Sequence, residues 1–470
     1  MTEQSDNRVR YWMVLLATMV AVLLYLDRVC ISTAAKSVEI DLHMESEHLK
    51  WVLSAFFWTY ALAQLPAGWI GDRFGARWVL GTYVALWSLT TALLAIAWDA
   101  RSLLVLRLLC GLFEAGAYPV AAGIVRKWVP AGSRGLASGF VSVGGRLGGA
   151  LAPIITIELM YRWSHGTSGF SVAEGVNPDP SSWRPVMALY GIVGVVISAI
   201  FVWLYRDKPE EHPLVTEREL AIIQDRVANG PAVVNGGLDD GRTKTARNAG
   251  LQSQAAPPLL WALMSNPSLC LMSFVQFASN LSWAFLVTMM PVYLEKVYAV
   301  KQQSTGWMQS LSLGCGIFGL LLGGTLTDWA TRMWGLRFGR AVMLMVSRGF
   351  VGTAFIVGMG VRDPLQAAIC LAVVGFATDL GIGSMWTYAQ DVGGKHAGTV
   401  LGWSNMWGNL GAALSPILFG SIAESQKENP AFGWQLAFLT CACVQFAACA
   451  AAYGVSAARP LFPEQSAAKQ

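Results

Sequence analysis

The sequence predicts an all-α membrane protein with twelve transmembrane helices in two six-helix halves. First, 54% of the 470 residues are hydrophobic and only 13% are charged, whereas about a quarter of the residues in soluble domains are charged. Second, apolar runs near the ~20 residues needed to cross a bilayer recur along the whole chain. Third, these runs are long and do not alternate, which favours helices over a β-barrel.

The apolar runs place the expected spans in chain order. They are residues 11–34, 51–70, 78–98, 102–124, 136–160, 185–205, 267–294, 304–328, 340–360, 364–388, 398–420 and 434–456. The first run, Tyr11 to Ile31, is longer than the apolar core of a signal peptide and has no small-residue cleavage site after it. We therefore expect it to remain in the protein as the first span.

The longest polar stretch, Arg206 to Pro258, follows the sixth span. Its middle is rich in Gly, Asn and Ala, a composition that predicts a mostly flexible linker. We therefore expect an N-terminal six-helix bundle (1–205), a cytoplasmic linker (206–260) and a C-terminal six-helix bundle (261–470).

A short motif repeats at corresponding places in the two halves. GWIGDRFGAR (68–77) follows the second span and GTLTDWATR (324–332) follows the eighth. The shared G-x-x-x-D pattern indicates duplicated six-helix units. We expect the motif to form a gate latch between neighbouring helices. Its residues in the first half are Gly68, Asp72, Arg73, Gly75 and Arg77.

Lysine and arginine residues predict the orientation in the membrane. With the N-terminus inside, most basic residues, including the many between 206 and 247, fall in cytoplasmic segments, and the opposite loops hold only scattered ones. Basic residues concentrate on the cytoplasmic side of membrane proteins. We therefore expect a monomeric, multi-pass protein of a bacterial inner membrane, with both termini in the cytoplasm.

Cysteines and histidines give no sign of a reactive or metal site. All eight cysteines lie in apolar runs, where they act as small hydrophobic side chains. The five histidines fall in expected loops without metal-ligand spacing. No basic cluster mixed with aromatic residues indicates nucleic-acid binding. We therefore expect no metal, no cofactor, no nucleic-acid partner and no enzymatic activity.

Several ionisable residues fall inside the spans, where a charge costs about 2.5–3.5 kcal/mol and normally faces a cavity or a partner. They are Asp27 and Arg28 in the first span, Arg107 and Glu114 in the fourth, Arg146 in the fifth, Arg348 in the ninth and Asp379 in the tenth.

The first four of these charges are expected to line one water-accessible chamber. At ~1.5 Å per residue, Asp27 lies ~24 Å from the inner end of its span, and Glu114 lies near the midplane. A guanidinium matches the geometry of a carboxylate, so Arg28 and Arg107 are candidates for binding an organic anion. Asp27 and Glu114 are the candidate proton carriers, because an anion arriving on an arginine favours protonation of a neighbouring carboxylate. The alternative is a set of static ion pairs.

Arg146 also lies near the midplane, level with Glu114, and we weigh a substrate contact equally against a structural role. Arg348 and Asp379 lie in the inner half of adjacent spans, and we expect them to form a structural or gating pair.

The second half instead carries uncharged polar side chains within its spans. Amides and indole N–H groups can bind hydroxyl groups, and aromatic faces can cover a sugar-like CH surface. The alternative role is interhelical hydrogen bonding, worth about 0.6 kcal/mol each. These residues are Gln276, Asn280, Trp283, Trp386, Asn405 and Asn409.

Five segments together resemble the anion:cation symporter family of the major facilitator superfamily. They are YLDR, FFWTYALAQLPAGWIGDRFGAR, RLLCGLFEAGAYP, QFASNLSWAFLVTMMPVYL and SNMWGNLGAALSP. The resemblance implies the major facilitator fold and proton-coupled uptake of organic anions, such as sugar acids, by alternating access. The family's protonation sites fall on Asp27 and Glu114, and its coupling arginines on Arg28 and Arg107. Its substrate contacts fall on Tyr60, Gln276, Trp386 and Asn405.

Arg146 departs from this resemblance, because we expect a neutral polar or aromatic residue of the family at its position. It indicates either a more anionic substrate, such as a dicarboxylate, or an ion pair with Glu114. We expect a proton-coupled symporter that imports an organic anion, a hexonate, hexarate or hexuronate. The alternative is a proton-independent facilitator or exporter of a mono- or dicarboxylate. An embedded enzyme and a nontransporting receptor are weaker rivals.

Overall fold

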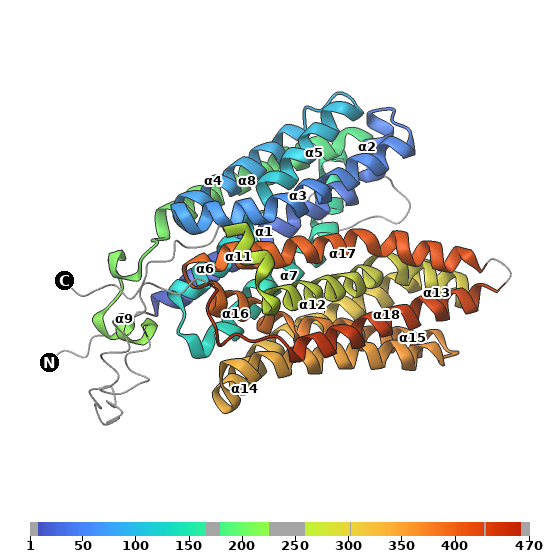
Figure 1. Ribbon diagram of the computed structural model, residues 1–470. Coiled ribbons are helices and arrows are strands. Elements are labelled where there is room, and N and C mark those ends of the chain that lie inside the picture. The colour runs from blue at the N-terminus through green and yellow to red at the C-terminus, as the bar shows by residue number, and fades with distance from the viewer. Residues whose placement is uncertain (1–7, 166–178, 225–258, 301, 427–428, 462–470) are drawn as a thin grey trace, which may run out of the picture.

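A computed structural model describes residues 8–165, 179–224, 259–300, 302–426 and 429–461. Within these ranges every regular element is a helix, and the long helices run roughly side by side in two bundles (Figure 1). Most of the expected linker, residues 225–258, lies outside the described residues.

The first bundle contains the N-terminal helices. They are α1 (Val9–Thr33), α2 (Ala35–Asp41), α3 (Ser46–Phe74), α4 (Ala76–Leu94), α5 (Ala100–Glu114), α6 (Ala117–Trp128), α7 (Arg134–His165) and α8 (Trp183–Leu204). The short helix α9 (Glu217–Ile223) follows it.

The second bundle contains the C-terminal helices. They are α11 (Leu259–Ser265), α12 (Pro267–Ala284), the π-helix η4 (Phe285–Met289), α13 (Met290–Tyr298), α14 (Gln302–Met359), α15 (Pro364–Leu380), α16 (Ile382–Gly393), α17 (Ala397–Ser425) and α18 (Pro430–Tyr453).

Each of the twelve expected spans corresponds to helix in the structure. By length and composition, eight stretches of the described residues are apolar enough to cross a membrane, and two of them, 308–359 and 364–422, each contain two expected spans. The two remaining spans lie in α3 and α4.

Three expected spans are not single regular helices. The fourth is divided between α5 and α6, the seventh contains the π-helical turn 285–289, and the tenth is divided between α15 and α16. Conversely, the eighth and ninth spans are joined as α14, across a kink at Gly335 with a φ of 74°. Such local breaks in a helix change little in its hydrophobicity, so an apolar run does not reveal them.

Polar caps begin several helices at the boundaries of the apolar runs. Asn266, Asp363 and Asn429 each accept a backbone hydrogen bond at the start of a helix whose first residue is proline. Proline fits there because the first N–H groups of a helix have no intrahelical partner. These caps account for the abrupt starts of α12, α15 and α18.

The two bundles meet at one end of the molecule, which we call the closed end. There α3 lies against α17 and α7 lies against α14, with glycines at the crossings. A Cβ on Gly68 would lie 2.3 Å from the carbonyl oxygen of Gly398, and one on Gly402 would lie 2.4 Å from that of Gln64. The short helix α9 lies at the same end, whereas the bundles diverge toward α2 and α13 (Figure 1).

Helix approach inside the first bundle also depends on glycine. A Cβ on Gly148 of α7 would lie 2.3 Å from the carbonyl oxygen of Val22 in α1. We expect Gly148→Leu to destabilise the protein by about 1–3 kcal/mol, because the added side chain forces the two helices apart. The measurement is the thermal unfolding midpoint in detergent. Gly420→Leu in α17 is the control, since no described atom lies within 4 Å of its Cβ position; equal midpoints for the two variants would contradict the prediction.

Candidate functional site

Arg28 and Glu114 form an ion pair inside the first bundle. Nε of Arg28 in α1 donates to Oε1 of Glu114 at 2.9 Å, and Nη2 donates to the same oxygen. Glu114 is the last residue of α5 and its side chain is buried, whereas the Arg28 side chain is 12% exposed. Both residues belong to the four charges expected to line one chamber, and the structure brings these two into direct contact.

Aromatic rings surround the Arg28 guanidinium. Its central carbon lies 4.3 Å from the ring centroid of Tyr60, 4.8 Å from that of Tyr25 and 5.1 Å from that of Phe56. Each such contact is worth about 0.5–1 kcal/mol, and more where water is excluded. The three rings hold the guanidinium in place beside Glu114.

Arg107 lies beside this cluster. Its guanidinium lies 4.7 Å from the centroid of the Phe56 ring, so Phe56 contacts both arginines. The Arg107 side chain is 2% exposed, its Nε has no hydrogen-bond partner, and it forms no ion pair with any described residue. Because burying an unpaired charge is costly, this guanidinium is suited to receive an anion. Arg28, Arg107 and Glu114 thus form one group, which we call the first triad.

Asp27 points away from the first triad. Its Oδ2 accepts a hydrogen bond from Nε1 of Trp87 in α4 at 3.1 Å, and its Oδ1 has no partner although it is buried. Successive residues of an α-helix point about 100° apart, since one turn holds 3.6 residues. Asp27 therefore faces α4 while Arg28 faces α3 and α5.

Arg146 pairs with Asp379 across the two bundles. Nε of Arg146 in α7 lies 3.0 Å from Oδ2 of Asp379 in α15, and Nη2 lies 2.7 Å from Oδ1. The anticipated pair between Arg146 and Glu114 is therefore not formed, because Arg28 occupies Glu114. The guanidinium of Arg146 also lies 5.0 Å from the ring centroid of Trp283 in α12.

The expected contact between Arg348 and Asp379 is not formed as a hydrogen-bonded pair, so that prediction was wrong for this conformation. Nη2 of Arg348 in α14 donates to the carbonyl oxygen of Thr378 at 2.8 Å and to Oγ of Ser347 at 2.6 Å. Nε and Nη1 of Arg348 are buried without a partner. The Asp379 carboxylate is taken by Arg146 because α7 packs against this face of the second bundle.

The uncharged polar residues of the second bundle also gather. Nε2 of Gln276 in α12 donates to Oδ1 of Asn405 in α17 at 3.2 Å, and the Asn280 amide lies beside Gly408 of α17. Nδ2 of Asn409 donates to the backbone oxygen of Asn405 at 2.8 Å, an interaction within one helix. Oε1 of Gln276 remains buried and unpaired. The amides thus leave hydrogen-bonding capacity unused.

Aromatic residues connect the bundles near these groups. The Trp386 ring in α16 meets Tyr118 of α6 edge to face, with centroids 5.4 Å apart, and Tyr118 in turn meets Tyr25 at 6.4 Å. Sequence reasoning missed Tyr25, Phe56 and Tyr118. Tyr25 precedes Arg28 by three residues and Tyr118 follows Glu114 by four, so helical spacing could have placed both on the same faces as the charges.

Asp72 joins the bundles at the closed end by capping a helix of the other half. Its Oδ1 accepts from the Gly398 N–H at 3.0 Å, and its Oδ2 accepts from the Thr399 N–H and the Thr399 hydroxyl, each at 2.6 Å. Gly398 and Thr399 begin α17, where free N–H groups and the helix dipole favour a carboxylate. The expected latch role of Asp72 thus has a specific geometry.

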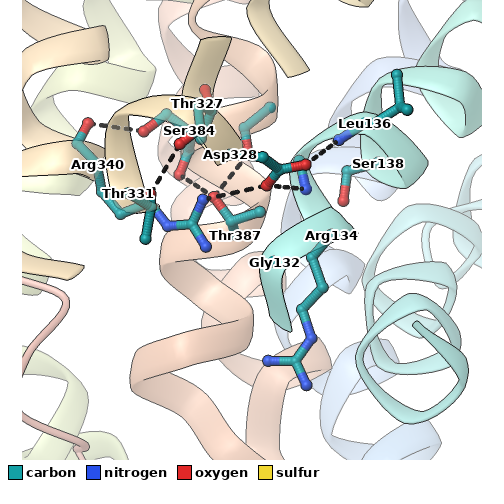
Figure 2. A network of polar contacts seen from close by, with 12 residues as sticks. Gly132, Arg134, Leu136, Ser138, Thr327, Asp328, Thr331, Arg340, Ser384 and Thr387 are labelled. Carbon is teal, nitrogen blue, oxygen red and sulfur yellow. Dashed lines mark hydrogen bonds and ion pairs between the residues drawn. The ribbon is translucent and has the colours of Figure 1, made fainter. Parts of the chain in front are cut away.

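Asp328, the aspartate of the repeated motif in the second half, makes the equivalent contact with a helix of the first half. Its carboxylate accepts from the N–H groups of Gly135 at 2.9 Å and Leu136 at 3.0 Å, at the start of α7 (Figure 2). Nη1 of Arg340 lies 3.6 Å from Oδ1 of Asp328, and its Nε lies 3.1 Å from Oδ2 of Asp391. Oδ1 of Asp391 in turn lies 3.5 Å from Nη1 of Arg134 in the first bundle. The repeated G-x-x-x-D motif therefore supplies one inter-bundle cap from each half.

The other motif residues act within or beside the first bundle. Gly75 has a φ of 88° and lies against the Asp207 carboxylate, which accepts the Ala76 N–H at 2.6 Å. Arg77 donates from Nε to the Val202 carbonyl at 2.8 Å, whereas Arg73 lies over the Trp69 ring at 5.2 Å. Only Asp72 and Gly68 of the five predicted motif residues thus meet the second bundle directly.

Burial raises the pKa of Asp72, which lies beyond the expected span 51–70, to about 6. The hydrogen bonds from Thr399 and Gly398 and the charge of Lys127 act in the opposite direction but only in part. Removal from water therefore outweighs the capping donors for this carboxyl group.

Comparison with known proteins assigns this architecture to a protein family. Residues 17–416 match the family model described as Major Facilitator Superfamily. The chain belongs to the Major Facilitator Superfamily. It is thus a multi-pass membrane protein with the fold that the sequence predicted.

Named relatives cover nearly the whole chain. A probable sulfoacetate transporter of Cupriavidus necator is 29% identical over 404 residues, which cover 85% of this chain and 84% of the relative. A probable galactarate/D-glucarate transporter of Bacillus subtilis is 27% identical and covers 90% and 87%, and a D-galactonate transporter of Escherichia coli O6:H1 is 26% identical and covers 91% and 92%. These names agree with the family resemblance of the five sequence segments.

A solved structure supports the same fold. The proton:xylose symporter bound to 6-bromo-6-deoxy-D-glucose superposes with a TM-score of 0.66 over 95% of each chain, at 13% sequence identity. At this identity the likeness concerns the fold alone.

Removing the Asp72 cap is expected to loosen the closed end. Asp72→Ala leaves the buried N–H groups of Gly398 and Thr399 without acceptors, at about 1–3 kcal/mol. The measurement is the distance distribution between spin labels at the exposed positions Phe74 and Lys395, one in each half, with the native cysteines replaced. We expect a new population at longer distance. Asp99→Ala is the control, because Asp99 caps α5 within one bundle through the Ser102 N–H at 2.8 Å; unchanged distances in Asp72→Ala would contradict the prediction.

The raised pKa of Asp72 predicts a pH dependence of closure. A carboxyl group that becomes solvated when the bundles part returns toward about 3.9. The closed arrangement has the higher pKa of about 6, so protonation favours closure, and the closed population should rise as the pH falls from about 7 through 6 toward 4. The same spin-label pair measures this. Asp72→Asn cannot titrate, and an identical pH response in that variant would refute the assignment to Asp72.

Proposed function

We propose that this chain is a proton-coupled symporter that imports an organic anion, a sugar acid of the hexonate, hexarate or hexuronate class, by alternating access. The observation that carries the proposal is the first triad, in which Arg28 pairs with Glu114 while the buried Arg107 beside them has no carboxylate partner among the described residues. Such a group has one positive charge in excess. An anion with carboxylate geometry would balance it.

The pairing of Arg28 with Glu114 suggests how protons couple to the substrate. When an acid group of the substrate takes the donors of Arg28 and Arg107, Glu114 loses its counter-ion inside a desolvated site. A proton on Glu114 then restores neutrality. Asp27, buried with one unpaired oxygen, is proposed as a second proton-carrying group next to the triad.

The hydroxyl groups of a sugar acid would be bound by the second bundle. Gln276, Asn280 and Asn405 offer amide donors and acceptors, and Tyr60 and Trp386 offer aromatic surfaces. The relatives named for sulfoacetate, galactarate, glucarate and galactonate transport support an organic anion as the substrate.

Alternating access follows from the closed end. The caps of Asp72 and Asp328 hold the bundles together on one side of the charged groups, so the described conformation admits substrate from the opposite end. We propose that the closed end faces the cytoplasm, as the distribution of basic residues predicts. Opening there would release the cargo.

Uptake into proteoliposomes tests the proposal. We expect labelled sugar acids to accumulate only with an inward proton gradient, and Glu114→Gln to abolish this accumulation while exchange of internal for external substrate continues, because the neutral side chain mimics the protonated carboxyl group. Glu158→Gln is the matched control, since Glu158 is also buried but pairs with Arg162 on its own helix at 2.6 Å. Uptake that only equilibrates the substrate, with or without the gradient, would instead indicate a facilitator.

A further inference from the structure

Arg146, Asp379 and Arg348 form a second group of two arginines and one carboxylate, which we call the second triad. Asp379 is 3% exposed and Arg348 is fully buried, whereas Arg146 is 14% exposed. Asp379 uses both oxygens on Arg146, and Arg348 keeps two buried N–H groups, on Nε and Nη1, without a partner. Like the first triad, it therefore has one positive charge in excess.

No other carboxylate among the described residues reaches these arginines. The titratable and charged groups near Asp379 are Arg146 from α7 and Arg348 from α14, and those near Arg146 include Tyr25 from α1 and Tyr118 from α6. Thr378 and Ser347 supply only neutral acceptors to Arg348. Among the described residues, therefore, nothing balances the excess positive charge of the second triad.

The two triads lie on either side of one aromatic group. The Arg28 guanidinium lies over the Tyr25 ring, and a Cβ on Gly145, next to Arg146, would lie 2.8 Å from that same ring. The Tyr118 hydroxyl also lies against Gly145. A molecule with an acid group at each end could meet one excess positive charge at each triad, whereas a monoacid could meet only one of them.

The pair of Arg146 with Asp379 joins the two bundles, whereas Arg348 and Asp379 belong to the same bundle. When α7 separates from α15, the pair of Arg146 with Asp379 must break, and an unpaired charge would be left on each bundle. The free Nε–H and Nη1–H groups of Arg348 can take over Asp379 without crossing between bundles. Arg146 is then left for a different anion.

We propose that Arg146 is a second anion site, occupied by Asp379 in the described conformation. The second acid group of a dianionic substrate displaces Asp379 from Arg146, and the carboxylate passes to Arg348. No covalent bond is made or broken in this exchange. No proton is needed at the second triad, because each of its two arginines ends with one anionic partner. The inference rests on the proposed function and narrows its substrate class to short polyols with an acid group at both ends.

A comparison of two substrates tests this inference. D-glucarate and D-gluconate have the same carbon chain, but gluconate has a hydroxymethyl group in place of the second carboxylate. We expect the kcat/KM ratio of glucarate to gluconate uptake in proteoliposomes to fall at least about tenfold in the Arg146→Gln/Asp379→Asn double variant, since one of the two charged contacts is removed. The double variant leaves no unpaired carboxylate between the bundles, so it is less prone to misfold than either single variant.

A second variant examines the exchange itself. In Arg348→Gln, Asp379 has no alternative partner and stays on Arg146, so we expect glucarate uptake to fall more than gluconate uptake. The matched control is Glu158→Gln/Arg162→Gln, which removes an ion pair of α7 that lies within one helix; its substrate ratio should equal that of the unmutated protein.

The outcomes separate the two proposals. Sugar-acid uptake with an unchanged ratio in the double variant would overturn the second anion site and leave the proposed function standing. In that case the pair of Arg146 with Asp379 is a static link between the bundles. No uptake of either sugar acid by the unmutated protein in a proton gradient would overturn the proposed function and this inference with it.

Discussion

An ionised side chain between membrane helices is costly unless it meets a counter-ion, a hydrogen-bonding partner or a water-filled cavity. This constraint explains where two of the buried carboxylates of this protein lie. Glu114 lies against Arg28, and Asp379 lies against Arg146, in each case from a different helix. The pairs thereby hold α1 to α5 and α7 to α15. Because each carboxylate has two arginines near it, the pairing balances only part of the positive charge, and this remainder is the basis of the proposed anion binding.

Backbone N–H groups at the start of a helix also need partners, and the contacts that supply them help to join the bundles at the closed end. The first N–H groups of a helix need acceptors, and Asp72 and Asp328 supply them to α17 and α7 of the opposite bundle. Both aspartates come from the same position of a repeated motif, so the closure is symmetrical. Glycines at the crossings let the backbones approach closely enough for these short bonds. Polar caps thus add to the apolar cluster of buried residues from both bundles, such as Val125 and Val400, that also joins the two halves.

Some of the buried charged groups lie within one bundle, whereas others join the two bundles. The first triad lies wholly within the N-terminal bundle. The pair of Arg146 with Asp379 and the aromatic contact of Tyr118 with Trp386 cross between the bundles. Any separation of the bundles at these positions would break both contacts.

Much of this was predictable from the sequence where the signal runs along the chain. Apolar runs marked all twelve spans, and the charges within them marked the arginines and carboxylates of both triads. The breaks near Gly116 and Gly381 were not visible, because a local interruption leaves an apolar run intact. Tyr25 and Tyr118 could have been found from their spacing to Arg28 and Glu114. Arg348 was matched to Asp379 on depth alone, and depth does not say which face of a helix a residue occupies.

The sequence by itself determined the all-α membrane architecture, its two related halves, the repeated motif and the set of buried charges. Only the tertiary structure decided that Glu114 faces Arg28, that Asp379 faces Arg146 and that Asp72 caps α17. The physical reason is that an ion pair requires atoms within about 4 Å, whereas each residue turns the direction of a helical side chain by about 100°. The rotation of each helix is set by packing against helices far away in the sequence, and that packing selects the partner.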